Sequence, residues 1–134
     1  MTYHASFADH LENPRNVGEL PDASITVEEQ NPACGDRLRL SLKVENDLIT
    51  DIKIKAYGCP QTLAAASVMT ELADHRSVDE ALQLTRQQIA DALGGLPRNK
   101  MHAAALAIDA LNSALGKLTN QSNTEPADNQ NRSF

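Results

Sequence analysis

The chain has 134 residues and carries 18 Asp and Glu against 12 Lys and Arg, for a formal net charge of −6. At roughly 150 residues per domain this length predicts one domain, and the acidic balance argues against nucleic acid as a partner. No apolar run approaches the ~20 residues that span a bilayer, and the start of the chain lacks the pattern of a secretory signal. Two cysteines cannot build a disulfide scaffold, so we expect a cytoplasmic protein.

The first part of the chain predicts a short helix followed by a strand. Tyr3, Phe7 and Leu11 recur at four-residue intervals, which is typical of one face of a helix. The helix is expected to stop at the Asn-Pro pair of residues 13–14, because the residue before a proline is driven out of the α region. A short strand is expected at residues 24–28.

The clearest pattern in the sequence is an alternation of apolar and polar residues at 37–44. Leu or Val occupies every even position there, and Arg, Ser or Lys every odd position, as in a strand with one buried face. A turn at 45–47 and a second alternating run at 52–57 complete a β-hairpin. One-sided burial of this kind is typical of an antiparallel sheet that is covered on one face.

From residue 60 onward the sequence becomes helical. Pro60 suits the first position of a helix, and the stretch 62–72 is small and apolar nearly all round, so this helix is expected to lie buried against the sheet. Two capping boxes then predict the starts of two short helices: Ser77 with Glu80, and Thr85 with Gln88.

A last helix is predicted by an apolar stripe from Met101 to Leu118, and the polar residues that follow have almost nothing to bury. We therefore interpret residues 1–119 as one folded domain and residues 120–134 as a disordered polar tail. Strands that precede helices along the chain indicate an α+β fold, with a three-stranded antiparallel sheet and helices packed on one face.

Three places in the chain carry residue types that bind metals, and each lies where an element begins or ends. Cys34 and Asp36 stand two apart at the start of the predicted strand, so they face the same way, and Gly35 between them lets a ligand approach. Cys59 precedes the buried helix, at the positive end of its dipole, and His102 lies in the first turns of the last helix. Two thiols, a carboxylate and an imidazole suit zinc, and cysteine thiolates also suit iron–sulfur clusters.

Ordinary structural roles also fit these residue types. Two cysteines in a cytoplasmic domain are more often small buried hydrophobes than a functional pair, and a disulfide between them is disfavoured in a reducing compartment. A single histidine on a helix is more often a surface or core residue than a ligand. His4, His10 and His75 have no matching partners and are expected at the surface.

Four short motifs, in order along the chain, carry a resemblance to a known family. They are Glu-Asn-Pro-Arg-Asn-Val-Gly at 12–18, Pro-Ala-Cys-Gly-Asp at 32–36, Tyr-Gly-Cys at 57–59, and Leu96-Pro97 followed by Lys100 and His102. From about Phe7 to Leu118 the chain resembles the IscU/NifU N-terminal scaffold proteins of iron–sulfur cluster assembly. The resemblance implies a platform for building clusters rather than an enzyme.

In that family a cysteine desulfurase delivers sulfur, iron enters, and a [2Fe–2S] cluster forms before it passes to an acceptor apoprotein. The resemblance places the family's cluster or metal ligands on Cys34, Asp36, Cys59 and His102, with zinc as the alternative occupant of the same site. It also implies a cysteine desulfurase and acceptor apoproteins as partners, and it leaves both a monomer and a dimer open.

Two departures from the family pattern bear on function. Ala103 stands where the family has its third ligand cysteine, so three thiolates cannot come from one chain, and the harder donors would hold a cluster less tightly. Residues 96–100 read Leu-Pro-Arg-Asn-Lys in place of Leu-Pro-Pro-Val-Lys, which weakens the expectation of docking to an Hsp70-type chaperone. The alternative hypotheses are a zinc-binding structural or regulatory relative and, ranked last, a zinc-dependent sulfurtransferase, whose usual insertion and third cysteine are missing here.

Overall fold

The alternating sequence forms the central strand of a three-stranded sheet in the computed structural model, which describes residues 5–31 and 35–123. The strands are β1 (Ile25–Asn31), β2 (Asp36–Glu45) and β3 (Leu48–Tyr57), paired antiparallel in the order β1-β2-β3. Leu38, Leu40 and Leu42 are fully buried on one face, while the Arg and Lys side chains between and beyond them point the other way. The predicted hairpin and its one-sided burial are confirmed.

The β2–β3 turn and the end of β1 show how local chemistry and pairing shape the sheet. Asn46 and Asp47 have φ angles of 56° and 64°, which these two residue types tolerate and which a tight hairpin turn requires. β1 continues past the expected end at residue 28, because its last residues pair with β2 as far as Asn31 opposite Asp36. This pairing fixes the position of the first residue of β2.

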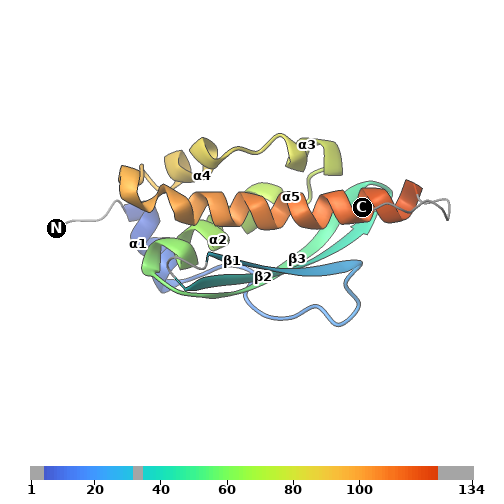
Figure 1. Cartoon of the computed structure of the whole chain (residues 1–134), viewed down its shortest axis with the longest axis horizontal. Helices are drawn as coiled ribbons and strands as arrows, with labels where there is room; N and C mark the ends of the chain where they lie inside the picture. The colour runs from blue at the N-terminus through green and yellow to red at the C-terminus, as the bar shows by residue number, and fades with distance from the viewer. Residues whose placement is uncertain (1–4, 32–34, 124–134) are drawn as a thin grey trace.

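The helices lie on one side of the sheet, with α1 at one end of the molecule (Figure 1). They are α1 (Ala5–Glu12), α2 (Pro60–Ala73), α3 (Val78–Leu82), α4 (Arg86–Ala92) and α5 (Met101–Asn123), with a 3₁₀ turn, η1 (Arg98–Lys100), before α5. Pro60 lies in the first turn of α2, and both predicted capping boxes are formed. α5 continues past the start of the predicted tail, and residues 124–134 of that tail lie outside the described residues.

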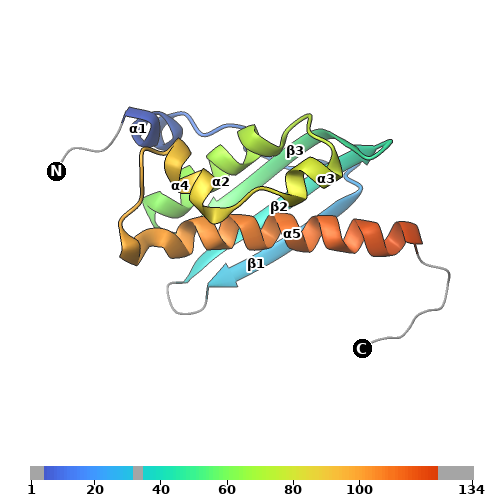
Figure 2. The ribbon, with the colours of Figure 1, turned by 90° about the horizontal axis from the view of Figure 1, so that it is seen from above.

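The layer that rests directly on the sheet consists of α2 and α5 (Figure 2). α5 crosses β1 and β2, α2 packs on β3, and α3 and α4 pack against this layer. Ala64, Ala65 and Ala66 are wholly buried, as expected for a helix that is small and apolar nearly all round. Within residues 5–31 and 35–123, no helix has the length and apolar character needed to cross a bilayer.

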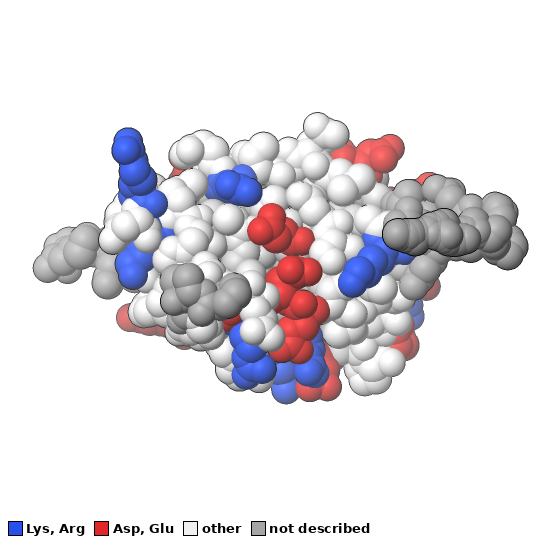
Figure 3. Space-filling model, in the orientation of Figure 1, with Lys and Arg blue, Asp and Glu red and all other residues white. Residues whose placement is uncertain are grey.

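The outer face of the sheet is charged, and its basic side chains lie beside carboxylates. The ion pairs include Arg37–Glu28, Arg39–Glu28, Arg39–Glu19, Lys43–Asp22 and Lys55–Glu19. Figure 3 shows acidic side chains across the middle of one face of the molecule, from α5 toward the sheet, with Lys and Arg below them. Positive charge is therefore interleaved with negative charge, and exposed pairs of this kind add little stability.

The expectation that His10 lies at the surface is wrong, because the residue is buried between α1 and α2 at 5% exposure. Its Nδ1 lies 2.6 Å from Oγ of Ser67, and its Nε2 lies 3.2 Å from Oε1 of Glu71. A neutral ring satisfies both contacts, since Nε2–H donates to the carboxylate and Nδ1 accepts from the hydroxyl. Burial lowers the pKa of His10, against the raising effect of Glu71. His75 is exposed as expected, whereas His4 lies outside the described residues.

Candidate metal centre

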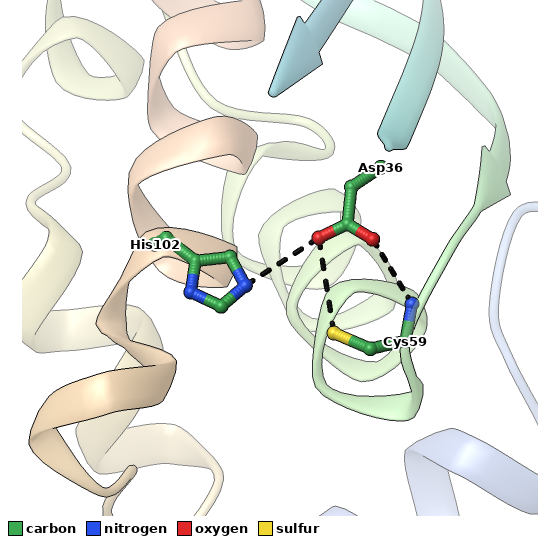
Figure 4. Close-up of side chains that lie close together, drawn as sticks. All are labelled: Asp36, Cys59 and His102. Atoms are coloured by element: carbon green, nitrogen blue, oxygen red, sulfur yellow. Dashed lines mark hydrogen bonds and ion pairs between the residues drawn. The ribbon is translucent and has the colours of Figure 1, made fainter. Parts of the chain in front are cut away.

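Three elements that meet at one end of the molecule bring three of the expected ligands together (Figure 4). Asp36 is the first residue of β2, Cys59 is the N-cap of α2 just after β3, and His102 lies in the first turn of α5. One donor atom from each residue lies within 4.8 Å of the other two. Cys34, the fourth expected ligand, lies outside the described residues and stays a prediction.

Asp36 is a buried carboxylate on which the other groups converge. Its side chain is 2% exposed. The backbone N–H of Cys59 donates to Oδ1 at 3.1 Å, and the hydroxyl of Thr62 donates to Oδ2 at 2.8 Å. Nε2 of His102 lies 3.4 Å from the same Oδ2. Burying a carboxylate is costly without such partners, so these contacts are what allow Asp36 to lie inside the protein.

Gly58 lets the end of β3 pass close to this carboxylate. Its φ is +143°, a backbone conformation that residues with side chains rarely adopt. A Cβ at this position would lie 2.0 Å from Oδ1 of Asp36 and 3.1 Å from its Cα. The Gly-Cys pair therefore has a steric reason: the glycine leaves room for Asp36, and the next residue supplies both an N–H group and a thiol.

The thiol of Cys59 lies at the start of α2 and faces the carboxylate of Asp36. Cys59 has extended backbone angles, and its side chain makes no capping hydrogen bond to the helix. Its Sγ lies 3.8 Å from Oδ2 of Asp36 and 3.4 Å from Oγ1 of Thr62. The residue is partly exposed, and its sulfur lies at the start of the helix beside donor atoms of Asp36 and His102.

The distances between the donor atoms fit a four-coordinate metal ion. Bonds of about 2.1 Å to oxygen and nitrogen and about 2.3 Å to sulfur place tetrahedral ligands about 3.4 to 3.6 Å apart. The distance from Oδ2 of Asp36 is 3.4 Å to Nε2 of His102 and 3.8 Å to Sγ of Cys59. Two of the three edges are therefore close to those of a tetrahedral ion, the donor atoms of Cys59 and His102 lie within 4.8 Å of each other, and the fourth corner is left for another donor. A mixed oxygen, sulfur and nitrogen set suits zinc or ferrous iron.

Two further residues, Thr62 and Ala103, lie next to the candidate ligands. Thr62 is 1% exposed and touches both Asp36 and Cys59, yet no sequence motif points to it. The available signal is its place three residues after Cys59, which puts both on one side of a helical turn. Ala103, at the position of the family's third cysteine, is 1% exposed and directly follows His102.

The chain forms an α+β domain, in which helices lie on one side of a three-stranded antiparallel sheet (Figure 1). Asp, Cys and His side chains converge at one end of this domain and form a candidate metal site. Residues 2–125 match the family described as the NifU-like N terminal domain, and this match covers nearly the whole chain. The chain belongs to this family, as the sequence motifs predict.

Relatives of known description agree with this assignment. The chain is 44% identical over 113 residues to the iron–sulfur cluster assembly scaffold protein IscU 1 of Archaeoglobus fulgidus. This match covers 84% of this chain and 74% of that protein. It is also 44% identical over 117 residues to the iron–sulfur cluster assembly enzyme IscU of Drosophila melanogaster, which covers 84% of this chain and 75% of that protein.

Solved structures share the architecture. One, described as an iron–sulfur cluster assembly scaffold protein for the SUF system of Fervidobacterium islandicum AW-1, has a TM-score of 0.69 at 23% identity and covers 84% of this chain and 96% of that chain. Another, an N-terminal NifU-like protein of Brucella abortus, has a TM-score of 0.71 at 17% identity and covers 88% of this chain and 94% of that chain. The predicted fold class is thereby confirmed.

Proposed function

We propose that the protein is an iron–sulfur cluster assembly scaffold or carrier, which holds iron or a [2Fe–2S] cluster as cargo. The ligands are Asp36, Cys59 and His102, with Cys34 as the fourth. The observation that carries this proposal is the convergence of three donor atoms within 4.8 Å in a chain of the NifU-like family. Relatives described as cluster assembly scaffolds support the choice of cargo.

Each residue has a role that follows from its chemistry. Cys59 is partly exposed, and we assign it the role of accepting sulfur from the persulfide of a cysteine desulfurase. Attack of its thiolate on the outer sulfur moves that sulfur to Cys59 and leaves the donor cysteine as a thiolate. Asp36 and His102 supply the harder donors that bind ferrous iron. The cluster then passes to an acceptor apoprotein, so the protein carries cargo and is not an enzyme. Thiol chemistry of this kind needs a reducing compartment, and we assign the protein to the cytoplasm.

The missing third cysteine sets how firmly the cargo is held. Ala103 offers no lone pair, so the described residues supply one thiolate beside a carboxylate and an imidazole. Carboxylate and imidazole bind iron–sulfur clusters less strongly than thiolates do. We infer a labile cluster that is easily released, which suits a carrier.

A zinc-binding relative that does not assemble clusters is the second candidate function. The specific observation in its favour is the match between the donor distances and the edges of a tetrahedral zinc site. If the protein has this function, zinc is retained through purification, and removing it with a chelator destabilises the fold.

Anaerobic reconstitution with ferrous iron and sulfide separates the two functions. The scaffold proposal predicts visible absorbance from a bound cluster, lost in Cys59→Ser and retained more firmly in Ala103→Cys. Ala110→Cys is the matched control, because Ala110 is also buried on α5 but lies about two helical turns further along. Stoichiometric zinc, with no cluster formed by either the wild type or Ala103→Cys, would overturn the scaffold function in favour of the zinc-binding relative.

A further inference from the structure

Thr62 is the third residue of α2, so the carbonyls three and four residues earlier lie before the helix, and its hydroxyl bonds to a residue of another element. Threonine hydroxyls further inside a helix commonly donate to a carbonyl three or four residues earlier in the same helix. Thr70, also buried in α2, does this, donating to the carbonyl of Ser67 at 2.7 Å. Thr62 instead donates to Oδ2 of Asp36 on β2 at 2.8 Å. Its hydroxyl is therefore directed out of its own helix and into the candidate metal centre.

The bonds from Cys59 and Thr62 fix how the carboxylate of Asp36 is oriented toward a cation. Oδ1 of Asp36 already accepts the N–H of Cys59, and one side of Oδ2 accepts the hydroxyl of Thr62. Two donors on different oxygens fix the plane of the carboxylate. A carboxylate oxygen has two lone pairs, so each oxygen keeps one beside these two bonds, and Oδ2 is the oxygen that Sγ of Cys59 and Nε2 of His102 also contact.

We propose that Thr62 is a positioning residue for the metal centre: its hydroxyl holds Asp36 so that Oδ2 offers a single lone pair to the cation bound by Cys59 and His102. This inference rests on the proposed function, because it concerns the same site. Hydrogen-bond partners of metal ligands typically raise metal affinity about 10- to 100-fold. Because this chain lacks a third thiolate, its metal affinity depends more strongly on how the carboxylate of Asp36 is oriented.

Titration of the metal-free protein with Co²⁺ under anaerobic conditions tests this role. Tetrahedral Co²⁺ has visible absorption bands that report both affinity and geometry. We expect Thr62→Val, which keeps the shape but removes the hydroxyl, to raise the Kd for Co²⁺ about 10- to 100-fold and to change the bands. Thr62→Ser restores the hydroxyl and is expected to behave like the wild type. Thr70→Val is the matched control, because it removes a buried hydroxyl of the same helix that does not touch the site.

A second cycle in the Asp36→Ala background, where position 36 has no side-chain oxygen for the hydroxyl of Thr62 to hold, distinguishes positioning from a general effect on the fold. If Thr62 acts through Asp36, Thr62→Val causes no further loss of Co²⁺ affinity there. An equal loss in both backgrounds overturns the proposal, as does wild-type affinity and spectrum in Thr62→Val. Those results leave the proposed function intact, whereas failure of the wild type to bind Co²⁺ overturns both. Should Thr62→Val not fold, Thr62→Ala carries the same comparison with Thr62→Ser.

Discussion

Replacing Gly58 with alanine tests whether the carboxylate of Asp36 is held where the site needs it. The new Cβ would lie 2.0 Å from Oδ1 and 3.1 Å from the backbone Cα of Asp36, so the side chain has to turn away from the N–H of Cys59. An alanine at positive φ costs about 1 to 2 kcal/mol. Losing a hydrogen bond to a charged group costs about 1.5 to 3 kcal/mol. We expect Gly58→Ala to lower the free energy of unfolding by about 2.5 to 5 kcal/mol.

Gly95→Ala is the matched control for this substitution. Gly95 also has a positive φ, of +104°, but a Cβ there meets nothing within 4 Å. This variant is expected to lose only the about 1 to 2 kcal/mol of backbone strain. Urea unfolding followed by circular dichroism gives both free energies, and Co²⁺ titration gives the effect on metal affinity. Equal losses of stability in the two variants, with unchanged Co²⁺ binding in Gly58→Ala, would refute the reasoning.

Three further predictions concern the rest of the fold, all measured by urea unfolding. Burial lowers the pKa of His10, so below pH 6.5 the unfolded chain binds a proton at His10 that the folded chain does not. The free energy of unfolding is therefore expected to fall as the pH drops below 6.5. If His10→Gln shows the same pH dependence as the wild type, His10 is not the cause. Ser67→Ala removes the partner of the His10 ring and of the Arg15 N–H, and we expect a loss of about 1 to 3 kcal/mol rather than none. Glu28→Gln removes exposed ion pairs only, and a loss above about 1 kcal/mol would show that they matter more than their exposure suggests.

The strands and helix starts were predictable because their signals are local. The alternation at 37–44 sets which face of β2 is buried, and each capping box lies within four consecutive residues. The end of β1 was not predictable in the same way. Residues 29–31 are polar and carry no strand signal of their own, and they are extended because they pair with β2.

The sequence singled out Asp36, Cys59 and His102, which the structure brings together, but it did not reveal the contacts that support them. Cys59 and His102 stand in motifs that the family shares, whereas the burial of His10 depends on partners that lie on another helix. The role of Thr62 depends on how closely Asp36 approaches the start of α2, which Gly58 allows. Such contacts follow from packing between distant segments, so the sequence motifs do not reveal them.

The metal content of protein purified without air or chelators tests most directly whether one centre is built from three elements. We predict iron or zinc in the wild type, below one equivalent where labile cargo has been released, and a content several-fold lower in Asp36→Asn, Cys59→Ser and His102→Ala. His75→Ala, which removes an exposed histidine away from the site, is expected to keep the metal of the wild type. Metal-free wild-type protein, or metal that stays in all three ligand variants, would contradict the account.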